Sequence, residues 1–351
     1  MTRSYRRLLT AVAAIGVLSV GWVFAGVAGA QSGEVTISGS STVEPITSLA
    51  AELFAEKQPD ATIRVDGPGT GDGFVLFCQG ETDASDASRQ IKDEGDEAPA
   101  CRANGIEYTE LPIGIDGLTV VANNSSKIKC LSFNDLYAIF GPESSGGTVD
   151  LADTSALATE LGGSKSPTSG TVKKFTPGAE SGTYDSFIEI AYQKIMDAQL
   201  EAGAIPSDKV GTNDEGEQDV TEPLVAAGTF PNDNDIVKRV EGSKNGLGFF
   251  GFAYFNENKG DLKAVAIEDP DSGKCVKPTV KTIKDGTYPI SRTLYIYPNN
   301  AKVSSNATLK DFLNYFITKK NLTKLVSQAN YVPLAAADIQ STVDAWKQLS
   351  G

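Results

Sequence analysis

Apolar side chains return at regular steps along most of the chain after residue 33. Steps of three and four residues predict amphipathic helices at 41–58 and 183–200. We also expect strands at 34–39, 61–67, 110–123 and 288–299, further helices at 74–80, 132–141, 309–320 and 338–350, and a helix followed by an aromatic strand within 233–258. Strands that alternate with helices in this way indicate an α/β protein with largely parallel sheets.

The first thirty residues have a different character. Basic residues near the start precede a long apolar stretch that ends on the small residues A-G-A at 28–30. This order is typical of a secretory signal peptide, so we expect residues 1–30 to be removed by cleavage after Ala30. The apolar stretch is also long enough to span a bilayer, and an uncleaved membrane anchor is therefore the alternative.

The chain is strongly acidic. Its 31 basic and 45 acidic residues give a formal charge of −14, and loss of the leader with its three arginines would leave 28 basic residues and a charge of −17. Such a surface repels nucleic acid and anionic lipid, so we expect no nucleic-acid partner. The length of 351 residues and the apolar fraction of 40% suit a globular protein with two packed units.

Four cysteines, Cys78, Cys101, Cys130 and Cys275, make an even number for an exported chain, which predicts two disulfides. Of the three possible pairings we prefer Cys78 with Cys101, because that bond closes a short loop and stabilises by about 3 kcal/mol in the chain-entropy model. This choice leaves Cys130 for Cys275. No C-x-x-C spacing and no histidine occur, so we expect no metal site.

The absence of histidine also limits the chemistry of the chain. It excludes Ser-His-Asp and Cys-His catalysis and removes the side chain that usually titrates near neutral pH. A secreted phosphoesterase with Ser181 as its nucleophile is an alternative, but the segment GAESG lacks the G-x-S-x-G elbow and no histidine base is present. We therefore expect a protein that is not an enzyme and needs no cofactor.

Three segments share one local design: SGSSTVEP at 38–45, GPGTGDG at 67–73 and GAESGTYD at 178–185. Each adjoins a predicted strand, offers Ser or Thr hydroxyls and leads into a predicted helix. Helix N-termini present unpaired N–H groups that hold anions without a positive surface. Any one of the three segments could be a plain N-cap, but three together favour an anion site. The glycine loop matches neither a Walker A loop nor G-x-G-x-x-G, so we do not expect nucleotide binding.

The segment DASDASRQ at 83–90 places acidic residues close to Arg89. A solvated ion pair on a surface turn is one interpretation, and such a pair contributes little to stability. The other interpretation gives Arg89 to the anion as a forked donor and Asp86 to the anion's proton. A carboxylate repels an anion that carries no hydrogen, so this arrangement would accept protonated phosphate and reject sulfate.

These motifs, in their order along the chain, resemble the periplasmic phosphate-binding protein of the phosphate-specific (Pst) ABC transporter. The segments that carry the resemblance are ISGSSTVEPI, GPGTGDGF, GETDASDASRQI, ELPIGIDGLTVV, ESGTYDSF, NGLGFFGFAYF and YPISRTLYIY, and the match runs over nearly all of residues 33–345. The resemblance implies capture of inorganic phosphate and its delivery to an ABC permease. It also implies a monomer in the periplasm or on the outer face of the cytoplasmic membrane.

The fold implied by the resemblance is periplasmic-binding-protein-like (type II), with two α/β lobes joined by two crossing strands and a ligand cleft between them. The crossings should be the strands at LPIGIDGL and YPISRTLY. Lobe 1 would then contain residues 33–112 and 287–351, and lobe 2 residues 113–286. On that division each of the preferred disulfides lies within one lobe, so neither obstructs closure.

The resemblance assigns the phosphate site by position to Ser41, Thr42, the backbone at Val43, Thr70, Asp86, Ser181, Gly182 and Thr183. One position departs from the family pattern, because many members carry an arginine four residues before the serine of S-G-T and this chain has Pro177 there. Arg89 is our candidate for the missing guanidinium. A sibling carrier for sulfate or molybdate, and an adhesion module in which every Ser/Thr cluster is a cap, are the remaining alternatives.

Overall fold

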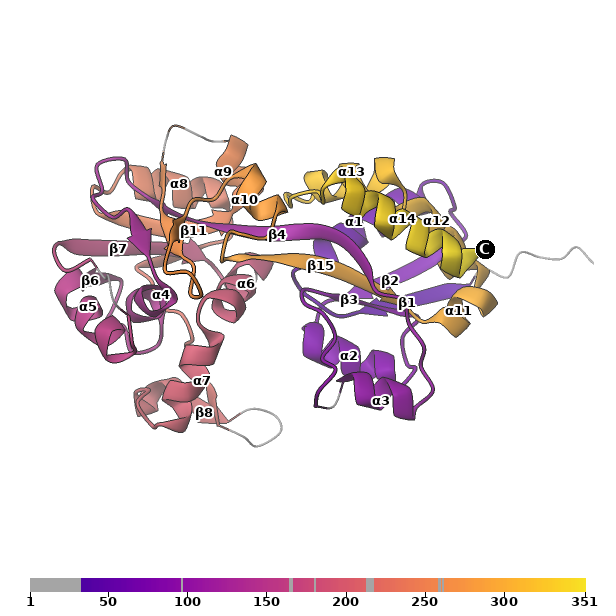
Figure 1. Cartoon of the computed structure of the whole chain (residues 1–351), viewed down its shortest axis with the longest axis horizontal. Helices are drawn as coiled ribbons and strands as arrows, with labels where there is room; N and C mark the ends of the chain where they lie inside the picture. The colour runs from indigo at the N-terminus through magenta and orange to yellow at the C-terminus, as the bar shows by residue number, and fades with distance from the viewer. Residues whose placement is uncertain are drawn as a thin grey trace, which may run out of the picture. The chain divides into compact units, whose positions relative to one another are not determined.

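The computed structural model describes residues 33–95, 97–163, 167–179, 181–212, 218–257, 260 and 262–351. The expected signal peptide at 1–30 lies outside these residues. Across the described part of the chain, no helix combines the length and the apolar character that crossing a membrane requires. Strands and helices alternate along the chain as the sequence predicts (Figure 1).

One mixed sheet forms the centre of the fold. Its strands lie in the order β10-β7-β11-β4-β15-β3-β1-β2, with β12 beside β4 and β6 beside β7. The strand bounds are β1 (Glu34–Ser38), β2 (Thr62–Asp66), β3 (Ala84–Ala87), β4 (Leu111–Ala122), β6 (Thr148–Asp150), β7 (Thr171–Pro177), β10 (Gly228–Phe230), β11 (Gly246–Gly251), β12 (Lys263–Ala264) and β15 (Ser291–Pro298). β1 is parallel to β2 and β3, and β7 is parallel to β10 and β11, whereas β4 and β15 are antiparallel to each other and to their outer neighbours.

Helices and two small sheets complete the fold. The helices are α1 (Glu44–Ala55), α2 (Thr70–Cys78), α3 (Glu97–Ala103), α4 (Phe133–Phe140), α5 (Leu151–Glu160), α6 (Gly182–Ala191), α7 (Gln193–Glu201), α8 (Asp233–Glu241), α9 (Phe252–Glu257), α10 (Val280–Lys284), α11 (Asn300–Ser305), α12 (Ala307–Phe316), α13 (Lys319–Gln328) and α14 (Ala336–Ser350), with a 3-10 turn at Ser207–Lys209. One small sheet joins β5 (Cys130–Leu131), β13 (Ala266–Glu268) and β14 (Cys275–Val276), and the other joins β8 (Val210–Thr212) to β9 (Gln218–Val220).

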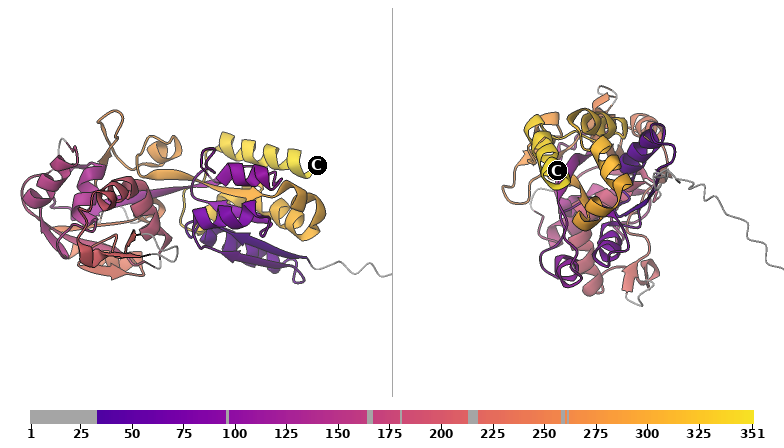
Figure 2. Two further views of the ribbon diagram at one scale, coloured as in Figure 1. Left: turned by 90° about the horizontal axis from the view of Figure 1, so that it is seen from below. Right: turned by 90° about the vertical axis from the view of Figure 1, so that its right-hand side faces the viewer.

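β4 and β15 form the long antiparallel pair in the middle of the sheet. Figure 1 shows them side by side, and their register places Arg292 opposite Asp116. The C-terminal helices α13 and α14, yellow in Figure 2, contact β4. The Thr342 hydroxyl of α14 donates to the Pro112 carbonyl at 2.8 Å. These strands are the two segments that the resemblance names as crossings. The lobe boundaries at residues 112/113 and 286/287 stay a prediction.

Aromatic packing fixes the two helices whose N-termini matter most for the site. On α6, Phe187 stacks on Phe249 of β11 with ring centroids 3.7 Å apart and meets Phe140 of α4 edge-on at 5.4 Å. On α1, Phe54 meets Phe312 of α12 edge-on at 5.6 Å. All five rings are buried, so each helix is anchored to the core along its apolar face.

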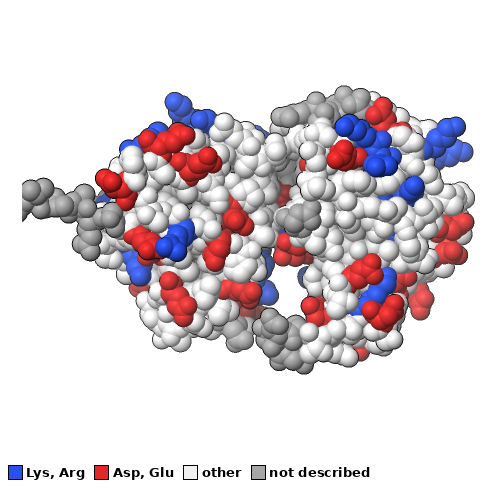
Figure 3. Space-filling view, turned by 180° about the vertical axis from the view of Figure 1, so that it is seen from behind, with Lys and Arg blue, Asp and Glu red and all other residues white. Residues whose placement is uncertain are grey.

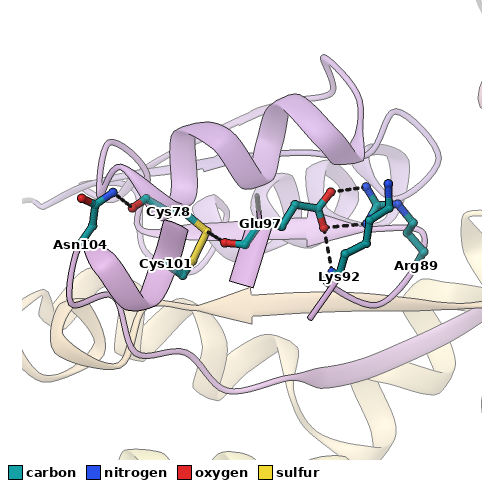
Figure 4. The surroundings of a disulfide bond; sticks show 6 residues. All are labelled: Cys78, Arg89, Lys92, Glu97, Cys101 and Asn104. Atoms are coloured by element: carbon teal, nitrogen blue, oxygen red, sulfur yellow. Dashed lines mark hydrogen bonds and ion pairs between the residues drawn. A yellow bond between two sulfur atoms is a disulfide. The ribbon is translucent and has the colours of Figure 1, made fainter. Parts of the chain in front are cut away.

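The structure forms both disulfides in the preferred pairing. Cys78 at the end of α2 bonds to Cys101 on α3 across 23 residues of sequence (Figure 4). Cys130 of β5 bonds to Cys275 of β14 across 145 residues. The second bond joins two strands that lie on either side of β13 in the same small sheet.

Several elements differ from their predicted bounds. The helix predicted at 309–320 is divided between α12, which ends at Phe316, and α13, which begins at Lys319. The helix predicted at 74–80 begins at Thr70, directly after Gly69, whose positive φ of 124° favours glycine. The helix predicted at 183–200 breaks at Tyr192, whose backbone leaves the helical region and whose buried hydroxyl donates to the Pro223 carbonyl at 3.1 Å. The aromatic strand predicted to run to residue 258 ends at Gly251, after which the chain turns into the short helix α9.

Candidate functional site

The N-terminus of α1 lies against β3. Gly39 lies so close to β3 that a Cβ there would be 1.9 Å from the Asp86 carbonyl oxygen, so only glycine fits. The next residue, Ser40, donates its backbone N–H to that same oxygen at 3.0 Å, and its hydroxyl accepts the Thr42 N–H at 3.2 Å. A chain of hydrogen bonds therefore connects Asp86 to Thr42 through Ser40. α1 has no side-chain cap of its own.

The N-terminus of α2 lies beside this first segment. The Gly69 N–H donates to the Gly39 carbonyl at 2.8 Å, and α2 also has no side-chain cap. Thr70 is buried, and its hydroxyl accepts the Ser88 N–H at 3.1 Å and lies 3.0 Å from the Ser88 hydroxyl. The structure thus brings two of the predicted residues, Thr70 and Asp86, to one end of the strands β1 and β3.

Asp86 is fully buried, with no exposed surface. Burial raises the pKa of its carboxyl group to about 8, and the nearby carboxylates of Glu44 and Asp66 add to this rise. The Thr47 hydroxyl is near enough to lower the pKa in part, although neither group completes a hydrogen bond of good geometry within the described residues. A buried carboxyl group without partners is poised to bind a ligand that can share a proton with it.

The N-terminus of α6 meets that of α1. Thr42 donates to the Gly182 carbonyl at 3.4 Å, and its hydroxyl lies 2.9 Å from the Ser186 hydroxyl. The neighbouring Ser41 hydroxyl donates to the Asp185 carboxylate at 2.9 Å. A Cβ at Gly182 would lie only 3.0 Å from the Ser41 carbonyl oxygen, so glycine permits this approach. Two helix N-termini that lie far apart in sequence therefore converge.

Three predicted residues have hydrogen bonds that limit what they offer to a ligand. The Val43 N–H already donates to the Ser40 carbonyl at 3.0 Å, and the Val43 side chain is buried. The Ser181 hydroxyl caps α6 by accepting the Thr183 N–H at 3.3 Å. This pairing is the plain N-cap that the sequence leaves open as an alternative for each segment.

Arg89, our sequence-based choice for the guanidinium, has a carboxylate partner of its own. It donates from Nη1 and Nη2 to the two Glu97 carboxylate oxygens at 2.9 and 2.6 Å (Figure 4). Its guanidinium also lies over the Phe74 ring. The pKa of Glu97 is lowered: burial opposes this shift, but the hydrogen bonds from Arg89 and Lys92 outweigh it. The arginine that the structure brings to Thr42 is a different one.

Arg292 of β15 is the residue that sequence reasoning missed. Its Nη2 donates to the Ser186 hydroxyl at 2.9 Å and to the Thr42 hydroxyl at 3.3 Å. Its side chain is 14% exposed, and it lies within YPISRTLYIY, a motif that we noted only as a crossing strand. Arg292 is the one charged residue of β15, and this is the signal that was available.

The site lies in an acidic protein. On the face shown in Figure 3, acidic side chains are spread widely and the basic ones lie in separate groups among them. An anion bound by this chain must therefore be held by local donors rather than by a positive surface. Among the described residues, the only metal-like cluster is Cys130, Glu268 and Cys275, and its two sulfur atoms are already joined in a disulfide.

Comparison with known proteins gives a consistent result. The PBP superfamily domain matches residues 26–320. Protein SphX of Synechococcus elongatus is 36% identical over 310 residues, covering 88% of this chain and 80% of that protein, and the phosphate-binding protein PstS of Staphylococcus saprophyticus is 35% identical over 311 residues, covering 88% and 83%.

Solved structures show the same likeness. A possible phosphate binding protein from Planctomyces limnophilus superposes with a TM-score of 0.75 at 31% identity, covering 91% of this chain and 99% of that one. An ABC-type phosphate transport receptor from Vibrio cholerae, with a TM-score of 0.55 at 20% identity over 86% of this chain and all of that one, shares the fold. The chain therefore belongs to the PBP superfamily and, within it, to the family of the phosphate-binding protein PstS.

Proposed function

We propose that this protein captures inorganic phosphate outside the cytoplasmic membrane and delivers it to the permease of an ABC transporter. The observation that carries the proposal is the convergence of the α1 and α6 N-termini, where Thr42, Gly182 and Ser186 are in direct contact. Two helix N-termini that point at one place supply partial positive charge and hydrogen-bond donors to an anion. PstS of Staphylococcus saprophyticus is named a phosphate-binding protein, which supports the same ligand here.

The binding donors in this proposal come from several elements. Thr42 and Ser41 lie at the α1 N-terminus, Thr70 at the α2 N-terminus, and Gly182 and Thr183 at the α6 N-terminus. Each hydrogen bond to a charged group contributes roughly 1.5–3 kcal/mol, so several together offset the dehydration of phosphate. The contacts that now join Thr42 to Gly182 and Ser186 would be exchanged for contacts to the anion.

Asp86 would select the anion by its protonation state. Because burial raises the pKa of this carboxyl group to about 8, Asp86 and a bound phosphate can share one proton between them near neutral pH. Sulfate brings no proton of its own, so it would be accepted only while Asp86 is itself protonated. Discrimination against sulfate therefore depends on pH in this proposal, and it strengthens as Asp86 ionises.

Capture would use the two lobes predicted from the sequence. β4 and β15, the paired strands in the centre of the sheet, would bend as the hinge when lobe 33–112 with 287–351 closes on lobe 113–286. The surface of the closed form then differs from that of the open form, so the permease can distinguish protein with bound phosphate from protein without it. The protein would act as a monomer and without a cofactor.

A calorimetric titration of the purified protein with phosphate, sulfate and molybdate tests the proposed function. We expect tight binding of phosphate and, at pH 9, binding of sulfate that is weaker by at least about 100-fold. Tighter binding of sulfate or molybdate than of phosphate would assign the protein to another oxyanion. Turnover of a chromogenic phosphoester would instead support the phosphoesterase alternative, for which Ser181 lacks a histidine base.

A further inference from the structure

One arginine of the central strand pair lies between the two converging helix N-termini. We propose that Arg292 is the guanidinium that binds the anion, that Asp116 positions it, and that Glu189 occupies its outer end when no anion is bound. This inference rests on the proposed function, because it names the cationic residue of the same site.

The contacts of Arg292 place its donors where an anion would lie. Nη2 donates to both Ser186 of α6 and Thr42 of α1, the two hydroxyl groups that lie 2.9 Å apart at the convergence. Nη1 donates to the Glu189 carboxylate, which lies one turn further along α6. The guanidinium thus contacts both helices that the proposed function joins through the ligand.

Asp116 supports the guanidinium from the strand side. It is the cross-strand partner of Arg292 in the β4–β15 pair, and its Oδ2 lies 3.9 Å from Arg292 Nε. Both of these atoms are buried, and within the described residues neither forms a hydrogen bond. Burial raises the pKa of Asp116, while the nearby Arg292 opposes that rise. In this inference the buried Asp116 carboxyl group attracts the inner end of the guanidinium and so orients its two outer nitrogens.

Glu189 supplies a carboxylate at the place where the anion's oxygens would be expected. Its side chain is 45% exposed, whereas those of Asp116 and Arg292 are 4% and 14% exposed. An ion pair with one exposed partner contributes little, so the Glu189 side chain can rotate into solvent when a stronger acceptor arrives. Phosphate offers the guanidinium two parallel acceptors, which a guanidinium matches better than an ammonium group does.

Arg89 is the competing assignment. Both ends of its guanidinium are engaged by Glu97, whose side chain is only 14% exposed, and a second donor, the Lys92 N–H, holds the same carboxylate at 2.8 Å. Release of Arg89 would leave the Glu97 carboxylate largely buried with two hydrogen bonds fewer. Release of Arg292 from Glu189 leaves an exposed carboxylate in water.

Phosphate titrations of matched variants test the inference. We expect Arg292→Gln to weaken phosphate binding by about 100-fold and Arg292→Lys by about tenfold, because lysine keeps the charge but loses the fork. Arg64→Gln, at an exposed arginine of β2, is the control and should bind as the unaltered protein does. Glu189→Gln should strengthen binding by about two- to fivefold, since it removes a competing charge.

Double variants separate positioning from general damage to the fold. Asp116→Asn should weaken phosphate binding in the unaltered background and have no further effect in the Arg292→Gln background, because Asp116 acts through Arg292. The gain from Glu189→Gln should disappear in that background too. If Arg292→Gln does not fold, the inference is tested by the loss of phosphate affinity in Arg292→Lys and the gain of affinity in Glu189→Gln, each measured against the unaltered protein.

The outcomes distinguish this inference from the proposed function. The inference is overturned, while the function stands, if three results are found together. These are phosphate binding by the unaltered protein, equal binding by Arg292→Gln, and no binding by Arg89→Gln. If the unaltered protein binds no phosphate, the function itself fails, and the assignment of Arg292 fails with it.

Discussion

The hydroxyl oxygens of Thr42 and Ser186 lie 2.9 Å apart, although 144 residues separate them in the chain. Both residues lie near a helix N-terminus, one at the start of α1 and the other in the first turns of α6. A contact of this kind between two helix N-termini places their partial positive charges together, which is unfavourable unless an anion or a carboxylate compensates. Asp185, in the first turn of α6, is one such carboxylate in this structure.

We expect Thr42→Val to weaken phosphate binding by about tenfold, because valine keeps the shape of the side chain and removes one hydrogen bond to the anion. Thr42→Ser keeps the hydroxyl and should bind within about twofold of the unaltered protein. Isothermal titration with phosphate measures both variants. Equal affinities for the valine and serine variants would contradict a ligand role for the Thr42 hydroxyl.

We expect the stability of the phosphate-free protein to fall as pH rises from about 5 to 8, in part because of Asp86. Its folded-state pKa is about 8, above the ordinary value of 3.8, so in this window the unfolded chain has released a proton that the folded chain still holds. This one group lowers the free energy of unfolding by about 1.4 kcal/mol per pH unit.

Asp86→Asn removes the titrating group and should therefore show a smaller slope. Urea unfolding at pH 5, 6, 7 and 8 measures the difference between the two proteins. The Asn variant should gain stability relative to the unaltered protein at each step of that series. Parallel pH dependences for the two proteins would mean that Asp86 ionises near its ordinary pKa.

Sulfate binding should depend on pH more steeply than phosphate binding does. Below about pH 8 the neutral Asp86 carboxyl can donate its proton to a sulfate oxygen, whereas above that pH its carboxylate repels sulfate. Because the protonated fraction of Asp86 falls about tenfold between pH 7 and 9, we expect sulfate affinity to fall by up to about tenfold over this range at constant ionic strength. Asp86→Asn should remove most of this dependence, and a flat sulfate profile in the unaltered protein would argue against the selection role of Asp86.

The two disulfides should differ in their effect on stability. Cys130–Cys275 spans 145 residues and Cys78–Cys101 spans 23, so loss of the first should cost about 5 kcal/mol and loss of the second about 3 kcal/mol in the chain-entropy model. Paired Cys→Ser variants, compared by urea unfolding, measure this difference. A larger loss from the Cys78–Cys101 variant would show that local packing of α2 on α3 outweighs the loop-length effect.

The sequence predicts the elements that have strong local signals and misses what depends on distant contacts. The three- and four-residue spacing of apolar residues in α1 and the long apolar run in β4 predict the ends of both elements to within a few residues. At the break, the Tyr192 hydroxyl donates to the distant Pro223 carbonyl, a contact that no local pattern reveals.

The candidate site follows the same rule. Ser and Thr at helix N-termini are local signals, and they lead to Thr42 and Gly182. The choice of Arg89 used its nearness to Asp86 in sequence, but in the structure Glu97, from the next helix, holds that guanidinium. Arg292 acquires its partners only through the β4–β15 register and the position of α6, neither of which the sequence displays.

The hydrogen bond from Arg292 to Thr42 joins residues 250 positions apart, and the strand that carries Arg292 lies near the C-terminal end of the chain. A chain that crosses a membrane N-terminus first would therefore hold the Thr42 side of the site outside long before the arginine emerges. If Arg292 binds the anion as proposed, a translocation intermediate that stops before residue 292 lacks a part of the site. On that proposal, the chain could retain phosphate only after most of its residues have crossed the membrane.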